Sequence, residues 1–513
     1  MFRSSFSLAG AISFALLLGP WAAAQSIVER ESAAGVRIWD FPDDDADRFS
    51  IAVLVGVGAR DEQPGQAGIA HFLEHSLFLA TETRPSTPRD GDLLRRGINH
   101  NGYTSSEATI YYLTGRASQW SFMVDWLADH LLHPKLDPVE VAAEQRIVLE
   151  EIATRGPDFA AITVEHLFYG DHPLARSIGG SARTVGSIGA DDLRAFHERH
   201  YHAANIVVGF SGRVDTDECM QAVKLAFGSV SAKPTLSQDP AVEDRAPYQR
   251  TGDLWQSTDN RDTTGELDLG YHLRCEQPAE LGAMLVIERY LSRRFFDVAR
   301  EERQLTYAPL VDLEWGRDSQ RLAFKCSTSQ RKNVAELAGI AADLVAELQT
   351  IDSSVAASAI NSALGHFGCE SVDDLTDAME LAAWVSFRGS RVDDFVAQIA
   401  ALTPADLASV AERTLLPKQR YSLSSQRLLD TRSGGQVALF VLLVSVLVAL
   451  VLYREGVRRL LFRFLTRSRR PRKGKILAMP NRPPIQAVDV DDVERSIQKF
   501  FEAEDDDRST DDR

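Results

Sequence analysis

The chain has 513 residues, of which 44% are apolar and 25% charged, a balance typical of globular protein and large enough for about two or three domains. Its formal net charge is −17, although one basic segment near the C-terminus offsets part of the acidic excess. An acidic body of this kind lacks the basic surface that nucleic-acid-binding proteins use, which argues against nucleic acid as a partner.

The chain begins with a segment typical of a secretory signal peptide. Residues 1–24 combine an early Arg3, an apolar run and the triplet Ala22-Ala23-Ala24 before Gln25. A short apolar run that ends in an A-x-A pattern is the cleavage signal of exported proteins. We therefore predict that the signal peptide is removed and that the body is exported, into the periplasm if the source is bacterial.

The stretch "GIAHFLEHSLFLAT" (68–81) has apolar residues at helical spacing and predicts a helix with one buried face. His71 and His75 are four residues apart, so they project from the same side, with Glu74 beside them. Two imidazoles one turn apart can share one tetrahedral Zn²⁺, and the carboxylate is placed to take a proton from the attacking water. The pattern is H-x-x-E-H, the inverted form of the zincin motif.

A catalytic zinc site also needs a third protein ligand, and the predicted helix "AEQRIVLEEIATR" (143–155) offers Glu144, Glu150 and Glu151. Glu144 and Glu151 are seven residues apart and therefore face the same way after two turns. A solvated acidic helix face is the alternative interpretation of this run.

A second histidine cluster, "FHERHYH", contains His197, His200 and His202. Three histidines in six residues can bind a metal, but no acid that would serve as a base lies suitably beside them. They also lie where a predicted helix gives way to a strand. We interpret them as structural or surface residues.

The body contains two similar halves. The segment "GADDLRAFHERHY" (189–201) resembles "TPADLASVAERTL" (403–415) at an offset of 214 residues, and each precedes a strand-like stretch. The same offset relates the strand-like segments 50–60 and 264–274, which predicts a duplicated α+β unit. It also places HFLEH near 285–289, where both histidines are missing. Only the first half is therefore expected to carry the chemistry.

The polar, proline-containing segment 229–250 separates the two halves and is predicted to be a linker. Four cysteines have wide spacings that fit no metal pattern, so buried thiols and disulfides both remain possible for an exported body. These are Cys219, Cys275, Cys326 and Cys369.

An uncharged run, 437–453, approaches the length of about 20 residues that a membrane-spanning helix needs. The segment 454–475 that follows has ten Lys or Arg and one acid, a bias that marks the cytoplasmic side. We predict a transmembrane helix over 435–454, followed at 455–513 by a basic juxtamembrane segment and an acidic cytoplasmic tail. The alternative is a buried helix of a soluble domain.

HFLEH, followed 76 residues later by Glu151 with Glu144 seven residues before it, resembles the family of pitrilysin, insulin-degrading enzyme and the mitochondrial processing peptidases. The resemblance implies that His71, His75 and Glu151 bind zinc and that Glu74 is the base. Glu144 matches a supporting acidic position near the site.

Two further stretches carry the resemblance. "NHNGYTSSEATIYYL" (99–113) is similar to the family's segment beside bound peptide, which implies that Asn101 hydrogen-bonds the substrate backbone. "REERQLTY" (300–307) resembles the motif R-x-x-x-x-Q-L-x-Y, which implies that Arg300 and Tyr307 reach the substrate and the tetrahedral intermediate.

The resemblance covers residues 26–428 and departs mildly at Gly102, where relatives often carry Ala, and at Thr306, where they often carry Gly. It implies a zinc endopeptidase acting on peptides or unfolded segments, and dimerisation with itself or a related chain to close a chamber. A non-catalytic peptide-binding or assembly subunit is one alternative, and a membrane scaffold with an accidental HFLEH is another.

The expected fold is α+β, with two homologous sandwich-like domains in which a mixed β-sheet packs with helices, followed by the transmembrane helix. The first domain, 25–228, is expected to be catalytic, and the second, 251–428, non-catalytic.

Overall fold

The structure is a computed structural model, and it describes residues 27–426 except 33, 42–46, 86–90, 156–167, 171, 232–250, 258–264, 274, 276, 317–319 and 368–370. The predicted signal peptide, transmembrane helix and tail, most of the linker and Cys369 lie outside these residues. Among the helices that are described, none is long and apolar enough to cross a membrane.

The first half of the body is built on a six-stranded mixed sheet with the order β1-β2-β6-β3-β5-β4. β2 and β6 are parallel, and the other neighbours are antiparallel. The strands are β1 (Val28–Glu31), β2 (Arg37–Asp40), β3 (Arg48–Val55), β4 (Asn99–Thr104), β5 (Thr109–Arg116) and β6 (Ile206–Gly212).

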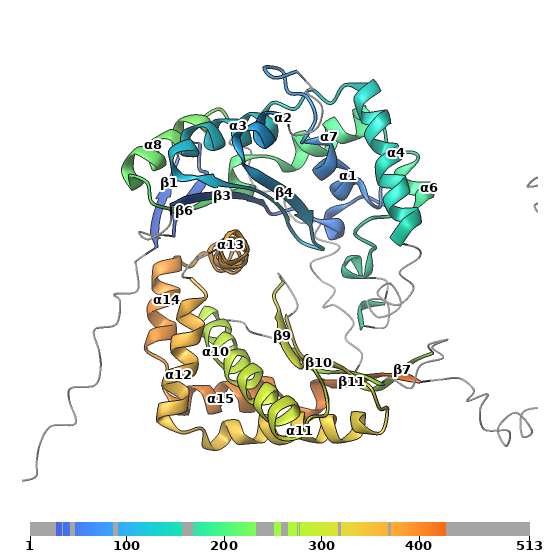
Figure 1. Ribbon diagram of the computed structural model, residues 1–513, viewed down its shortest axis with the longest axis vertical. Helices are drawn as coiled ribbons and strands as arrows, with labels where there is room; N and C mark the ends of the chain where they lie inside the picture. The colour runs from blue at the N-terminus through green and yellow to red at the C-terminus, as the bar shows by residue number, and fades with distance from the viewer. Residues whose placement is uncertain are drawn as a thin grey trace, which may run out of the picture. The chain divides into compact units, whose positions relative to one another are not determined.

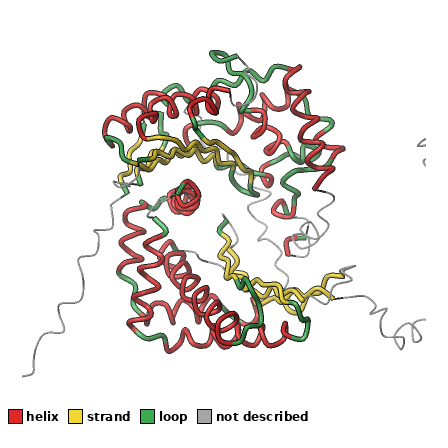
Figure 2. The backbone as a smooth tube through the Cα atoms, in the orientation of Figure 1, coloured by secondary structure: helices red, strands yellow, loops and turns green. Residues whose placement is uncertain are grey.

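Helices cover one face of this sheet (Figure 2). Alternate β3 side chains, among them Ile51 and Val53, share the core beneath these helices with Phe72 of α1 and Leu127 of α3. The helices are α1 (Ile69–Ser76), α2 (Gly91–Arg96), α3 (Trp120–Leu132), α4 (Pro138–Arg155), α6 (Ala182–Val185), α7 (Ala190–His200) and α8 (Thr216–Ala226).

The second half has a five-stranded mixed sheet with the order β7-β11-β8-β10-β9, in which β11 and β7 are parallel. The strands are β7 (Gly252–Ser257), β8 (Gly265–Leu273), β9 (Leu310–Glu314), β10 (Gln320–Thr328) and β11 (Arg420–Gln426). The helices are α10 (Pro278–Phe295), α11 (Asn333–Glu347), α12 (Ser353–Gly365), α13 (Val372–Phe387), α14 (Val392–Ala400) and α15 (Pro404–Thr414).

Short helical turns join these elements, namely η1 (Ala59–Asp61), η2 (Ala117–Gln119), η3 (Pro173–Ala175), η4 (Ala203–Asn205), η6 (Leu348–Thr350) and η7 (Pro417–Gln419). The segment η5 (Phe296–Glu302), which follows α10, is a π-helix.

The two sheets repeat one topology, as the sequence offset predicts. The order β2-β6-β3-β5-β4 corresponds to β7-β11-β8-β10-β9, including the parallel pair β2 with β6 and its counterpart β7 with β11. The matched segments 189–201 and 403–415 contain α7 and α15, each followed by the strand next to the central one. The α+β duplication is therefore confirmed, while the domain boundaries stay predictions.

The helix α13 of the second half packs on the first sheet, on the face opposite α1 (Figure 1). Leu54 of β3 and Val207 of β6 belong to the same buried cluster as α13 residues. Gly209 allows the close approach, because a Cβ there would lie 2.3 Å from the sulfur of Met379. The guanidinium of Arg37 lies 4.4 Å from the ring centre of Phe387 at the end of α13. The two halves therefore share one core.

Because the two halves share this core, truncating the fully buried side chain of Leu54 should destabilise the fold. Leu54→Ala should lower the free energy of unfolding by about 2–5 kcal/mol, since it removes buried methyl groups and leaves a cavity. Leu94→Ala is the matched control because Leu94 is 75% exposed. Denaturant unfolding followed by circular dichroism measures both, and equal small effects would contradict a shared core.

Candidate metal centre

The helix α1 is fixed at its N-terminus by the carboxylate of Glu62. The backbone N–H groups of Gly68 and Ala70 donate to its oxygens at 3.0–3.1 Å. Burial raises the pKa of Glu62 to about 8, while both N–H groups favour its charged form. Gly68 has φ of 92°, and a Cβ there would lie 2.7 Å from the carbonyl oxygen of Gly179. These contacts set the position of the helix that carries HFLEH.

The structure brings His71, His75 and Glu151 together. The two rings, from adjacent turns of α1, have centroids 4.7 Å apart. Glu151 Oε2, from α4, lies 3.3 Å from His75 Nε2 and 3.9 Å from His71 Nε2. One potential ligand atom from each residue lies within 4.8 Å of the others.

This group of three fits zinc by its donor chemistry. Two imidazole nitrogens and one carboxylate oxygen converge, which is a ligand set found in catalytic zinc sites that keep a fourth position open. Glu150, the neighbouring acid on α4, is exposed and lies outside the group.

Glu144 supports the group from two turns earlier on α4. Its Oε1 lies 3.0 Å from His75 Nδ1, and Glu144 itself is buried. A carboxylate can only accept here, so Nδ1 carries the hydrogen and Nε2 keeps its lone pair for a metal. Burial lowers the pKa of His75, but this hydrogen bond and the charges of Glu74, Glu151 and Glu144 outweigh it and raise the pKa above its ordinary value.

Glu74 lies beside the three-residue group without being part of it, as expected for a base. It is only 6% exposed. Thr104 of β4 donates a hydrogen bond to Glu74 Oε2 at 3.0 Å. No sequence pattern predicts a role for this hydroxyl, although it lies inside the predicted peptide-binding segment.

Asn101 lies on β4, the strand that ends the first sheet in the described part of the chain. It is exposed, whereas Tyr103, two residues on and on the same face, packs against the second half. The outer edge of β4 is therefore the edge that an added extended peptide would pair with.

Arg300, in η5 of the second half, packs with Tyr307. The Arg300 guanidinium lies over the rings of Tyr307, at 4.5 Å, and Phe296, at 4.9 Å. Tyr307 is 80% exposed, whereas Arg300 is half-buried. The departure at Thr306 is accommodated because its hydroxyl donates to the Ser327 carbonyl at 2.7 Å.

The second histidine cluster has contacts that support a structural interpretation. His197 Nε2 lies 2.7 Å from the Leu131 carbonyl oxygen, and its ring stacks on Tyr201. His200 and His202 are buried. Within the described residues, these three do not converge as the group on α1 and α4 does.

Three of the four cysteines are buried free thiols, so for these three the structure shows thiols rather than disulfides. They are Cys219, Cys275 and Cys326. Burial raises the pKa of Cys275 to about 12 and that of Cys326 to about 11, so both stay protonated at neutral pH.

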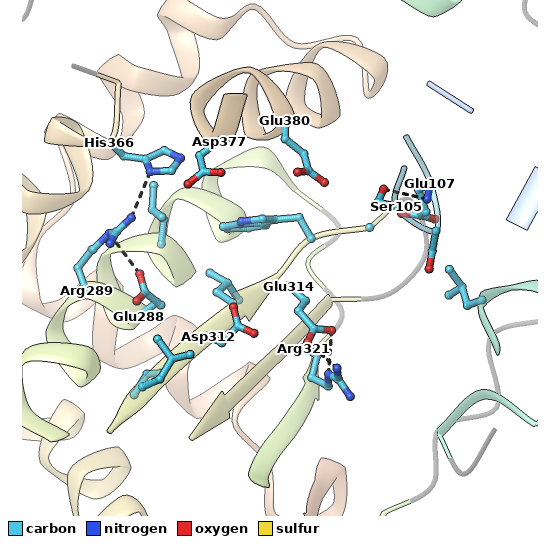
Figure 3. Close-up of a pocket in the computed structure, with 18 of the residues that line it drawn as sticks. Ser105, Glu107, Glu288, Arg289, Asp312, Glu314, Arg321, His366, Asp377 and Glu380 are labelled. Atoms are coloured by element: carbon cyan, nitrogen blue, oxygen red, sulfur yellow. Dashed lines mark hydrogen bonds and ion pairs between the residues drawn. The ribbon is translucent and has the colours of Figure 1, made fainter. Parts of the chain in front are cut away.

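A cavity of about 590 Å³ is lined by β9, α10, α13 and the turn after β4, and by none of the three grouped residues (Figure 3). It is rich in acids, some of them paired, as Glu288 is with Arg289 at 3.3 Å. Burial and the charges of Asp377 and Glu107 raise the pKa of Glu380 to about 7. Within the described residues these acids do not converge as metal ligands.

The inverted zincin motif and the duplicated α+β fold define a class of zinc metallopeptidase. Residues 42–178 match the family model "Insulinase (Peptidase family M16)", and residues 187–361 match "Peptidase M16 inactive domain". An uncharacterized zinc protease of Mycobacterium leprae is 31% identical over 323 residues, which cover 61% of this chain and 70% of that protein. The chain belongs to the peptidase M16 family, and its cofactor is Zn²⁺.

A further relative and a solved structure support the family and the fold. An uncharacterized zinc protease of Mycobacterium tuberculosis is 33% identical over 283 residues, 53% of this chain, and the match spans 64% of that relative's length. The crystal structure of a protease from Helicobacter pylori has a TM-score of 0.62 at 18% identity, covering 78% of this chain and 99% of that one. This likeness supports the two-domain α+β fold alone.

The geometry predicts three different effects of removing an acid from α4. Glu151→Gln should lose most of the zinc, and Glu144→Gln should weaken zinc affinity about 10- to 100-fold because His75 loses its orienting partner. Glu150→Gln, the matched control, should keep about one zinc per chain. Mass spectrometry of bound metal and chelator competition measure this, and equal zinc loss in the Glu150 variant would contradict the assignment.

Proposed function

We propose that the protein is a zinc-dependent endopeptidase that hydrolyses peptides or unfolded segments on the exported side of a membrane. The convergence of His71, His75 and Glu151, with Glu74 buried beside them, carries this proposal. The apolar run 437–453 and the signal-like N-terminus support the membrane anchor and the export, with the tail in the cytoplasm.

The roles of the residues follow from their placement. Zinc, when bound, supplies a Lewis acid that polarises the scissile carbonyl and acidifies water. Glu74 takes the proton of the attacking water and delivers it to the leaving amine. Asn101 and the edge of β4 hold the peptide in an extended conformation, with backbone hydrogen bonds supplying affinity.

Arg300 and Tyr307 stabilise the developing oxyanion in this proposal. Because their contacts lie within the second half and Tyr307 faces solvent, a second copy or a related chain supplies them to each site. This arrangement makes the dimer the working unit.

The second half fits a non-catalytic role. The α10 acid that corresponds to HFLEH, Glu288, accepts from the Ser292 hydroxyl at 2.7 Å and has no histidine partner in its own motif. A chain in which both halves were non-catalytic is the alternative function. The complete set of ligands and base in the first half disfavours it.

Replacing the base separates these two functions. Glu74→Gln keeps the shape but cannot accept the proton, so kcat should fall about 10²- to 10⁴-fold. Zinc content should stay at the parent level, because Glu74 is outside the ligand group. The full-length protein in detergent is assayed with internally quenched unstructured peptides. A parent that binds zinc and cuts nothing would favour the binding-subunit alternative.

Mixed dimers test whether Arg300 serves the site of the other copy. Glu74→Gln and Arg300→Ala chains are each expected to have little activity, but co-expressed they should form dimers with one intact site. That site combines Glu74 of one copy with Arg300 of the other, and about half of the parent activity per mixed dimer is expected.

The control for this experiment pairs Glu74→Gln with a chain that carries both substitutions, which leaves no intact site in either arrangement. Affinity tags of two kinds isolate the mixed dimers. An inactive mixture in the first pairing, with zinc and dimer present, would place Arg300 in the site of its own chain or remove it from the reaction.

A further inference from the structure

The strand β4 lies alongside α1, and two of its residues contact the side chain of Glu74. Successive strand residues alternate between the two faces of a sheet, so Gly102 and Thr104 share one face. Both lie against Glu74. Tyr103, between them, packs into the core that includes α13. The face of β4 toward α1 is therefore a seat for the Glu74 carboxylate.

We propose that Thr104 is a positioning residue that holds Glu74 in the orientation required of the base. The inference deepens the proposed peptidase function and rests on it. The Thr104 hydroxyl donates to Glu74 Oε2 at 3.0 Å, and Glu74 Oε1 lies on the side of Gly102. A hydrogen bond to a carboxylate is stronger than one between neutral groups, so it restrains a side chain that otherwise has several rotamers.

Gly102 supplies the room for this seat. A Cβ at this position would lie 3.0 Å from Glu74 Oε1 and 3.1 Å from its Cγ, closer than ordinary van der Waals contact. The carboxylate thus lies directly on the strand, between the bare backbone of Gly102 and the hydroxyl of Thr104. Gly102, where relatives often carry Ala, is therefore a residue that contacts the Glu74 carboxylate.

The position of Thr104 is itself fixed by the end of the hairpin. Thr104 pairs with Thr109 of β5, and the turn is closed by the Ser105 N–H, which donates to the Ala108 carbonyl at 2.8 Å. Thr109 is fully buried, and its hydroxyl donates to the Val57 carbonyl at 2.9 Å rather than to Glu74. The pair therefore offers two threonines in one register, of which only Thr104 bonds to the base.

The test compares Thr104→Val, Thr104→Ser and Thr109→Val in the full-length protein. Thr104→Val keeps the shape and removes the donor, so kcat should fall about 10- to 100-fold, with KM and zinc content unchanged. Thr104→Ser keeps the hydroxyl and should recover most of kcat. Thr109→Val should lower the unfolding midpoint while leaving kcat per zinc-loaded chain within about twofold of the parent.

A double variant shows whether the effect passes through Glu74. In a Glu74→Gln background, Thr104→Val should change kcat less than about twofold, since the two residues act as one unit. If Thr104→Val lowered kcat as much in the Glu74→Gln background as in the parent, the inference would be overturned. A Thr104→Val enzyme with the kcat of the parent would also overturn it.

Crystal structures give a readout that needs no activity. The parent and Thr104→Ser should show one Glu74 rotamer, and Thr104→Val should show a displaced or divided one. An undisplaced Glu74 in the Thr104→Val structure would overturn the positioning role. A parent that cuts no peptide would instead count against the proposed function, and the crystallographic comparison would still decide the role of Thr104.

Discussion

The site depends on one constraint, the fixed placement of α1 between α4 and β4. Two histidines one turn apart converge only on a helix, and the third donor must come from another element at a set distance. Glu151 and Glu144 both reach His75 because they lie two turns apart on α4. The carboxylate of Glu62 holds the start of α1, so the histidines are placed by backbone contacts rather than by each other. A preorganised donor set of this kind is what a metal centre requires.

The duplicated halves share a fold but differ in whether they carry the candidate metal ligands. The strand order β2-β6-β3-β5-β4 recurs as β7-β11-β8-β10-β9, yet among the residues that the structure describes the donor set occurs only in the first half. In the second half, the equivalent acid Glu288 is tied to Ser292 and Arg289 instead of standing beside a pair of histidines. That half contributes α13, which completes the core beneath the first sheet, and the contact of Arg300 with the exposed Tyr307. The fold is thus shared, while the function belongs to the site.

Features with a local periodic signature were predictable, and those that depend on tertiary contact were not. The helix of HFLEH follows from apolar spacing, and the repeated topology follows from an offset between two motifs. By spacing alone, Glu151 is one of three acids that could be the third zinc ligand, and only the family resemblance distinguishes it from the other two. The hydroxyl of Thr104 and the carboxylate of Glu62 have no pattern in the sequence, because each acts through a partner that only folding brings near. The placement of α13 on the other sheet is equally non-local, and the helix predicted at 435–454 stays a prediction.

Under the proposed function, the strand β4 would link substrate binding to catalysis, because each of its three surfaces has a different contact. Its outer edge is the one that an extended peptide would pair with, and its inner face holds Glu74 through Thr104. Its other face packs through Tyr103 against the second half, where burial and the charge of Glu380 raise the pKa of the phenol. An edge strand gains order when a partner adds to it, because its free N–H and C=O groups become paired. In the proposed peptidase, a peptide bound at this edge would therefore also steady the strand that orients the base. A peptide that pairs along all of β4 would then meet a better-placed carboxylate than a short one would.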